Sequence, residues 1–219
     1  MAKIILDDGS YPYLTEGAAF VGESGIPCLM NVNNVQIPKS LISFDKIKRT
    51  KDKYQFVHFY LHDKYFAHIL RDAPKYVDLL HQFDGVITPD FSLLINQSKC
   101  IQQTNTYYNR AVGYYFQKQG IPVIPNIRWS DENSFDFCFL GVPENYTVSV
   151  STHGCFKSKQ QKELFLIGMT EMLKVLKPRD VLVHGYMPDS LFNKFRDDTN
   201  LHRYPSLFEM THSNSNGVD

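Results

Sequence analysis

The chain has 219 residues, 43% of them hydrophobic, and its 23 Lys and Arg balance its 23 Asp and Glu. This hydrophobic content excludes global disorder, and the lack of a basic excess argues against nonspecific binding to duplex nucleic acid. The four cysteines stand far apart without a CxxC spacing, so we expect reduced thiols and no structural zinc.

Residues 1–50 form the least regular segment. Gly22, Gly25 and Pro27 interrupt it, and the basic run KIKRTKDK (46–53) follows. We interpret it as an N-terminal arm with one or two short strands, packed on an α/β domain at 51–211, with a flexible tail at 212–219. The basic run suits a solvated connection or a contact with phosphates. The N-terminus resembles no signal peptide and no apolar run approaches the ~20 residues of a membrane span, so we expect a cytoplasmic protein without a membrane partner.

From residue 51 onward, short apolar runs end in polar clusters and are followed by helical patterns. The runs predict strands near 55–60, 85–88, 122–127, 146–151 and 180–184, with an edge strand near 203–211 because Pro205 cannot donate to a ladder. The spacing of apolar residues predicts helices over 64–72, 74–83, 97–119, 159–177 and 189–196, with a short one around 134–141. The pattern is typical of an α/β fold: a mainly parallel sheet of five to six strands with helices on its faces, either open or an incomplete barrel.

Parallel strands deliver their carboxyl ends to one side of a sheet, so the polar clusters should converge on one site. The turn after the fourth predicted strand is the strongest local signal. Ser151, Thr152 and Gly154 give close backbone access before a helix, with Lys157 nearby, which favours an anion. The alternative is an ordinary capped turn.

The cluster after the third strand holds the single tryptophan. Trp129 has the flat ring to stack on a base, and Arg128 has the fork to bind phosphate or carboxylate. Alternatively, Trp129 fills the core, Arg128 pairs with Asp131, and the neighbouring serines cap a helix.

Two further groups of polar residues are the aspartates that follow the first two predicted strands and a pair on the predicted helix at 97–119. Asp63 and Asp90, the latter with Ser92 nearby, follow the first two strands. They could hold a divalent metal if Asp131 joined them, or could simply make turns. On the helix at 97–119, Asn109 and Arg110 form a polar stripe that either reaches a ligand or lies partly buried.

His153 and His184 stand at strand ends, where histidine can transfer protons or form hydrogen-bonded walls. Cys155 lies near a helix start, which can lower the pKa of a thiol, but neighbours on one turn rarely point together, so a Cys–His pair with His153 is not expected. No catalytic residue is assigned.

The segments FDGVITPDFSL, NTYYNRAVGYYFQKQGIPVIPNIRWSDENSFDFCFLGVPEN, VSVSTHGCFKSKQQKELFLIGMTEML and LKPRDVLVHG resemble an uncharacterised domain family common in phages, prophages and mobile elements of Gram-positive bacteria. The likeness covers roughly residues 55–190. It implies a genomic setting and no reaction, because the family has no assigned function. The positions that match its pattern are Asp90, Ser92, Asn109, Arg110, Trp129, Ser130, Asp131, Ser151, Thr152 and Gly154. The family is more often apolar at the position of His153.

Three hypotheses follow. The first is a phage or mobile-element accessory protein that binds a small anionic, nucleotide-like ligand, without a cofactor, and either withholds it from a host defence pathway or acts on it as an enzyme. The second is a metal-dependent nucleic-acid-processing enzyme, and the third a protein that binds a host factor through aromatic surface and the basic arm. Under the first hypothesis the ligand-binding residues are Asp90, Ser92, Asn109, Arg110, Arg128, Trp129, Asp131, Ser151, Thr152, Gly154, Lys157 and His184.

Overall fold

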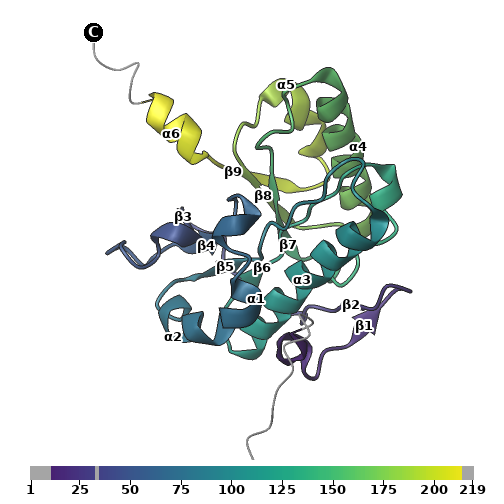
Figure 1. Ribbon diagram of the computed structural model, residues 1–219. Coiled ribbons are helices and arrows are strands. Elements are labelled where there is room, and N and C mark those ends of the chain that lie inside the picture. The colour runs from purple at the N-terminus through teal and green to yellow at the C-terminus, as the bar shows by residue number, and fades with distance from the viewer. Residues whose placement is uncertain (1–10, 33–34, 214–219) are drawn as a thin grey trace, which may run out of the picture.

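The computed structural model describes residues 11–32 and 35–213 (Figure 1). Predictions for residues 1–10, 33–34 and 214–219, including most of the proposed tail, lie outside this description. The strands are β1 (Phe20–Val21), β2 (Ile26–Pro27), β3 (Leu41–Ser43), β4 (Phe56–His58), β5 (Gly85–Ile87), β6 (Val123–Ile124), β7 (Thr147–Ser151), β8 (Asp180–His184) and β9 (Asn200–Tyr204).

The strands from β3 to β9 are parallel and lie in the order in which they occur along the chain. β3–β6 form a four-stranded sheet, β7–β9 form a three-stranded sheet, and β1 and β2 form a separate antiparallel pair. A single parallel bridge between Asn126 and Ser149 joins the two larger sheets. The prediction of a mainly parallel α/β structure is confirmed, and a strand occurs at each of the five predicted central positions. β3 is an addition: part of the predicted arm pairs along β4 as an outer strand.

The α-helices are α1 (Ile69–Asp72), α2 (Val77–Leu80), α3 (Lys99–Lys118), α4 (Lys159–Leu176), α5 (Asp189–Phe192) and α6 (Leu207–Ser213). Short 3-10 helices occur at η1 (Pro12–Thr15), η2 (Phe44–Lys46), η3 (Asp63–Tyr65), η4 (Ala73–Tyr76), η5 (Glu132–Ser134) and η6 (Asn193–Phe195). The two long helices match the predicted segments 97–119 and 159–177 to within two residues at each end. The predicted helices at 64–72, 74–83 and 189–196 are broken into short α and 3-10 turns.

The helix predicted around 134–141 is wrong. Only the three residues of η5 are helical there, and turns take the place of the expected helix from residue 135 onward. The backbone carbonyls of Cys138 and Leu140 accept hydrogen bonds from the side chain of Arg110. They are therefore used in a tertiary contact.

The strand predicted over 203–211 is correct only at its start. β9 ends at Tyr204, and α6 begins at Leu207 after a reciprocal cap: Ser206 N donates to Glu209 Oε2 over 2.9 Å, and Glu209 N donates to Ser206 Oγ over 3.3 Å. This Ser-x-x-Glu pattern is a helix-start signal that the strand prediction overlooked. α6 extends away from the rest of the protein (Figure 1).

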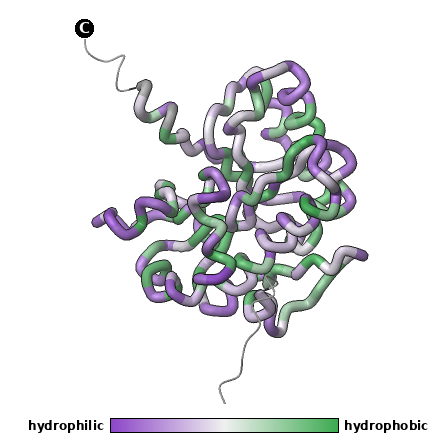
Figure 2. Tube along the Cα trace, in the orientation of Figure 1, coloured by the Kyte–Doolittle hydropathy of each residue, from purple (hydrophilic) through white to green (hydrophobic). Residues whose placement is uncertain are grey.

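The core explains why the strands read as continuous apolar runs. In β4, Val57 belongs to the apolar cluster that includes residues of α1, α2 and α3. Its neighbour Phe56 faces a second, central cluster, which also contains Ile124 of β6 and Leu182 of β8. In β8, Val181 and Val183 pack towards α4, whereas Leu182 faces the same central cluster. Both faces of each strand are thus buried, as in other parallel sheets. The loop between β3 and β4, which holds the basic run, projects as a hydrophilic segment (Figure 2).

Candidate functional site

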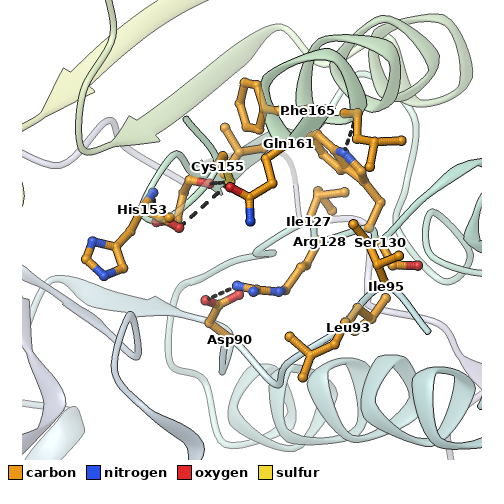
Figure 3. Close-up of a pocket in the computed structure, with 16 residues that line it drawn as sticks. Asp90, Leu93, Ile95, Ile127, Arg128, Ser130, His153, Cys155, Gln161 and Phe165 are labelled. Carbon is orange, nitrogen blue, oxygen red and sulfur yellow. Dashed lines mark hydrogen bonds and ion pairs between the residues drawn. The ribbon is translucent and has the colours of Figure 1, made fainter. Parts of the chain in front are cut away.

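The loops that follow β5, β6 and β7 enclose, together with the first turns of α4, a cavity of about 360 Å³ (Figure 3). It therefore lies at the carboxyl ends of neighbouring parallel strands, beside the bridge that joins the two sheets. Half of its lining residues are apolar: Leu93, Leu94, Ile95, Ile127, Trp129, Val150, Leu164 and Phe165. Small-molecule sites combine such an apolar wall with a few placed polar groups.

The floor of the cavity is an ion pair. Arg128 Nη1 donates to Asp90 Oδ2 over 2.7 Å, and Asn126 Nδ2 donates to Asp90 Oδ1 over 2.8 Å. The negative charge of Asp90 raises the pKa of Arg128 above its ordinary value. Asn126 itself is held because its backbone N–H donates to Thr88 Oγ1 over 2.8 Å. Arg128 thus pairs with Asp90 and not with Asp131, the partner considered as an alternative, and the Asp131 side chain accepts from Asn133 N at the start of η5.

Asn109 and Arg110 lie beneath this floor and do not line the cavity. The Arg110 side chain is only 1% exposed, and its donors are taken up by oxygens of Leu140, Cys138, Asn126 and Asn109. Burial lowers its pKa to about 10, which leaves the guanidinium charged at neutral pH. Its position ties α3 to the strand end at Asn126 and to the turn at 138–140.

Trp129 forms one wall of the cavity. Its Nε1 donates to the backbone carbonyl of Leu164 over 3.2 Å, and its ring lies 5.5 Å from that of Phe165 between centroids. Gly168 makes room for the indole, because a Cβ at that position would lie 2.1 Å from Trp129 Nε1. The indole is thus both packed against α4 and part of the cavity lining, and its stacking on a base stays a prediction.

The turn after β7 contributes Ser151, His153, Gly154 and Cys155 to the lining. Gly154 has φ +79°, and a Cβ there would meet no atom within 4 Å, so the backbone is openly accessible at this point. Burial raises the pKa of the Cys155 thiol to about 11, opposite to the lowered pKa that a helix start was considered to produce. The thiol is therefore protonated at neutral pH.

Several predicted site residues lie near the cavity without lining it. Thr152 Oγ1 donates to the carbonyl of His184, and Lys157 is exposed beyond the turn. Ser92 Oγ donates to Asp63 Oδ1 over 2.8 Å, which fixes the loop that carries Leu93 and its neighbours. Of the predicted set, Asp90, Arg128, Trp129, Ser151 and Gly154 come together in the lining.

His184 belongs to a buried ring cluster next to Ser151. Its ring stacks on that of Tyr60 at 4.3 Å between centroids and lies 4.9 Å from that of His58. Burial lowers the pKa of His184 to about 4, and burial also lowers the pKa of His58, so both rings are neutral at pH 7. His184 does not line the cavity, so it is not one of the residues that form its wall.

The acidic triad required by the metal-dependent hypothesis does not form. Asp63 binds the Ser92 backbone and hydroxyl, Asp90 pairs with Arg128, and Asp131 caps η5. Within residues 11–32 and 35–213, no group of three or more His, Cys, Asp or Glu is placed to hold a metal ion.

The first turns of α4 also contribute to the cavity, which was not predicted from the sequence. Gln161, Leu164 and Phe165 line it from one helix face, at spacings of three and four residues. This periodicity was visible in the sequence and would have placed that face over the strand ends. The apolar residues at 93–95 also line the cavity, and no prediction was made for them from the sequence.

Parallel strands with a partly apolar cavity and an ion pair at their carboxyl ends define an α/β protein with a pocket of small-molecule size. Residues 18–205 match the model of a family described as a domain of unknown function, DUF4417, and the chain belongs to this family. The resemblance to an uncharacterised family is thereby confirmed, and the match includes most of the predicted arm.

Two curated relatives come from phages. The chain is 37% identical over 131 residues to the Gene 1 protein of Mycobacterium phage L5, covering 60% of this chain and 57% of the relative. It is 33% identical over 156 residues to the Gene 1 protein of Mycobacterium phage D29, covering 70% of this chain and 56% of the relative. The matches thus span little more than half the length of these relatives. No solved structure matches the chain. The described helices include none with the length and apolar character needed to cross a membrane.

Proposed function

We propose that this protein binds a small nucleotide-like ligand in the cavity between the β5–β7 loops and α4. The observation that carries the proposal is the combination of Trp129 as a wall with the Arg128–Asp90 pair as a floor, in a space of about 360 Å³. Ligand sites of ~300–1,000 Å³ are common, so this one suits a single base or nucleoside better than a polymer or a dinucleotide.

The charges around the cavity favour the mouth as the position for the anionic part of the ligand. The charge of Arg128 is balanced by Asp90 at 2.7 Å, and the other lining side chains are largely apolar or neutral. A phosphate is better accommodated at the turn after β7, where Gly154 exposes backbone and Lys157 adds positive charge. The aromatic ring of the ligand would lie inside the cavity, and its phosphate would lie at the mouth.

The protonation states favour binding over nucleophilic catalysis. Burial raises the pKa of the Cys155 thiol, so a thiolate nucleophile is disfavoured, and Asp90 is already engaged by Arg128 and Asn126. In a protein with phage relatives, a ligand that is bound and returned unchanged fits sequestration from a host defence pathway. Mass spectrometry of the ligand after incubation separates this role from turnover.

The test uses Trp129 as its own reporter, because it is the single tryptophan of the chain. Titration with AMP, GMP, CMP and UMP should change its fluorescence saturably for at least one of them, with a matching heat signal in calorimetry. Stacking on an aromatic ring is worth ~1–3 kcal/mol per base, so Trp129→Ala should weaken binding by about one to two decades. Trp129→Phe, which keeps an aromatic wall, should lose less.

Tyr54→Ala serves as the control, because Tyr54 is an aromatic residue with 78% exposure that does not line the cavity. It should bind as the unmodified protein does. Absence of any fluorescence or heat response to all four nucleotides at millimolar concentration would contradict the proposal. Tight binding of long DNA or RNA at physiological salt would instead favour the nucleic-acid hypothesis.

A further inference from the structure

The end of β8 holds the turn that follows β7. Ser151 and His184 are paired positions of these two strands. Just beyond them, the carbonyl oxygen of His184 accepts from Thr152 N over 3.0 Å and from Thr152 Oγ1 over 3.3 Å. The Ser151 hydroxyl lies 3.4 Å from the same carbonyl oxygen and 3.4 Å from Nδ1 of the His184 ring. One residue of β8 therefore contacts two consecutive residues where the turn begins.

The backbone of the turn is ordered by its own hydrogen bonds as well. The N–H of His153 donates to Ser151 Oγ over 3.2 Å, and that of Cys155 donates to the Thr152 carbonyl over 3.0 Å. The N–H of Gly154 has no such partner in the part of the chain that the structure describes. Gly154 also has open space where a side chain would be. The turn thus uses the neighbouring N–H groups internally and leaves that of Gly154 available for an anion.

The His184 ring is itself held by a residue outside the cavity. It stacks on the ring of Tyr60 at 4.3 Å between centroids and 16° between planes. The Tyr60 hydroxyl makes a 2.5 Å hydrogen bond with Ser149 Oγ of β7. Gly185, the residue after His184, has φ +108°, and a Cβ there would lie 2.7 Å from Thr152 Oγ1. Tyr60, the end of β8 and the turn therefore form one closely packed unit.

We propose that His184, supported by Tyr60, positions the turn at 151–154 so that the Gly154 N–H binds the phosphate of the ligand. This inference rests on the proposed function and specifies how the anion-binding part of its site is held. Neither His184 nor Tyr60 lines the cavity. They are positioning residues, which act on the ligand through Ser151 and Thr152.

A direct attraction between His184 and the phosphate does not account for this role. Burial lowers the pKa of the His184 ring to about 4, so the ring is neutral at pH 7. The side chains of Tyr60 and His58 also pack against it, with centroids 4.3 and 4.9 Å away. Loss of the ring should therefore weaken the contacts that the turn makes with the phosphate and should spare those that Trp129 makes with the base.

The experiment compares each nucleoside with its 5′-monophosphate, by calorimetry and Trp129 fluorescence at pH 7.5. The pairs are adenosine and AMP, guanosine and GMP, cytidine and CMP, and uridine and UMP. For the base that binds, the monophosphate should bind the unmodified protein at least about tenfold more tightly than the nucleoside, because hydrogen bonds to a charged group are strong. His184→Ala should reduce this ratio to about threefold or less, through weaker binding of the monophosphate alone.

Further variants separate positioning from general packing. Thr152→Val removes the hydroxyl that donates to His184 and should reduce the ratio as His184→Ala does. His184→Phe keeps a ring to stack on Tyr60 and should retain most of the ratio. Phe83→Ala is the matched control, because it also removes a buried ring, but from the other side-chain cluster and outside the cavity lining. It should lower the melting temperature without changing the ratio.

The outcomes separate the two proposals. If neither nucleosides nor monophosphates bind, the proposed function fails and this inference falls with it. If nucleosides bind the unmodified protein as tightly as monophosphates do, the inference alone is overturned. The same holds if His184→Ala and Thr152→Val weaken both members of a pair equally or weaken neither, or if Phe83→Ala reduces the ratio as they do. Should melting curves show that His184→Ala is unfolded, Thr152→Val decides alone.

Discussion

The guanidinium of Arg128 donates from Nη1 to Oδ2 of Asp90 over 2.7 Å and joins the loops that follow β5 and β6. The two residues are 38 positions apart in the sequence. The Asp90 side chain is 10% exposed and that of Arg128 is 31% exposed, so the pair is partly shielded from water. This contact is stronger than a surface ion pair and supports both the cavity and the loops around it.

Asp90→Asn should lower the free energy of unfolding by about 1–3 kcal/mol, because a charged hydrogen bond is lost and Arg128 keeps an unbalanced charge. Urea unfolding measures the change. Asp136→Asn is the matched control: Asp136 pairs with Lys99, both side chains are more than half exposed, and a loss below about 0.5 kcal/mol is expected. Equal losses in the two variants would show that the Asp90 pair has no special structural role.

Arg110→Met should destabilise the protein by more than about 3 kcal/mol, since it leaves buried carbonyl oxygens of Cys138 and Leu140 without their donors. Arg110→Lys should not restore stability, because an ammonium cannot reproduce the spread of guanidinium donors. Unfolding free energies of both variants test this. A lysine variant as stable as the unmodified protein would mean that charge alone matters at this position.

Gly168→Ala should displace the Trp129 indole into the cavity. The added Cβ would lie 2.1 Å from Nε1, so the bond to the Leu164 carbonyl must break. We expect a shift of the tryptophan emission and weaker ligand binding, although alanine favours the helix itself by about 1 kcal/mol. Thr170→Ala, at an exposed position of the same helix, is the control. An unchanged emission spectrum in Gly168→Ala would contradict this account of the wall.

Stability should fall as the pH drops from about 6.5 towards 4. The folded state lowers the pKa of His184 to about 4, chiefly by burial and then by the nearby His153, whereas an unfolded histidine titrates near 6.5. The unfolded state therefore binds more protons in this window, which favours unfolding. His184 alone should contribute a loss of about 2 kcal/mol between pH 7.5 and pH 5. The stability of His184→Gln should depend less on pH over the same interval, and an unchanged pH dependence would refute the assignment.

The elements that the sequence predicts best are those whose signals are local. DVLVHG, a continuous apolar run after Pro178, corresponds to β8, and the spacing of apolar residues with Pro178 beyond gives the extent of α4. β3 is harder to recognise, because its three residues lie beside a basic run and its pairing with β4 is a tertiary contact. Short outer strands of this kind carry little periodicity of their own.

The candidate site is predictable in its location and less so in its members. Strand-end logic brings Asp90, Arg128, Trp129 and Ser151 to one cavity. Arg110 shows the limit: a polar helix stripe suggests ligand contact, but the acceptors of this side chain include backbone carbonyls, which every residue possesses and no sequence pattern marks. For Gln161 the spacing to Leu164 and Phe165 is the available signal, whereas its residue type is not, because a polar residue in a first helical turn is usually exposed to solvent.

The burial of the Arg110 guanidinium also bears on when α3 can pack during synthesis of the chain. Its helix leaves the ribosome before the carbonyl groups at 138 and 140 that receive its hydrogen bonds, 28 and 30 residues further along the chain. Chains grow at ~5–20 residues per second, so α3 spends about one and a half to six seconds before the partners of this charge have been synthesised. We therefore expect α3 to dock late, when the turn at 138–140 has emerged, and nascent chains that end before residue 138 to remain sensitive to protease.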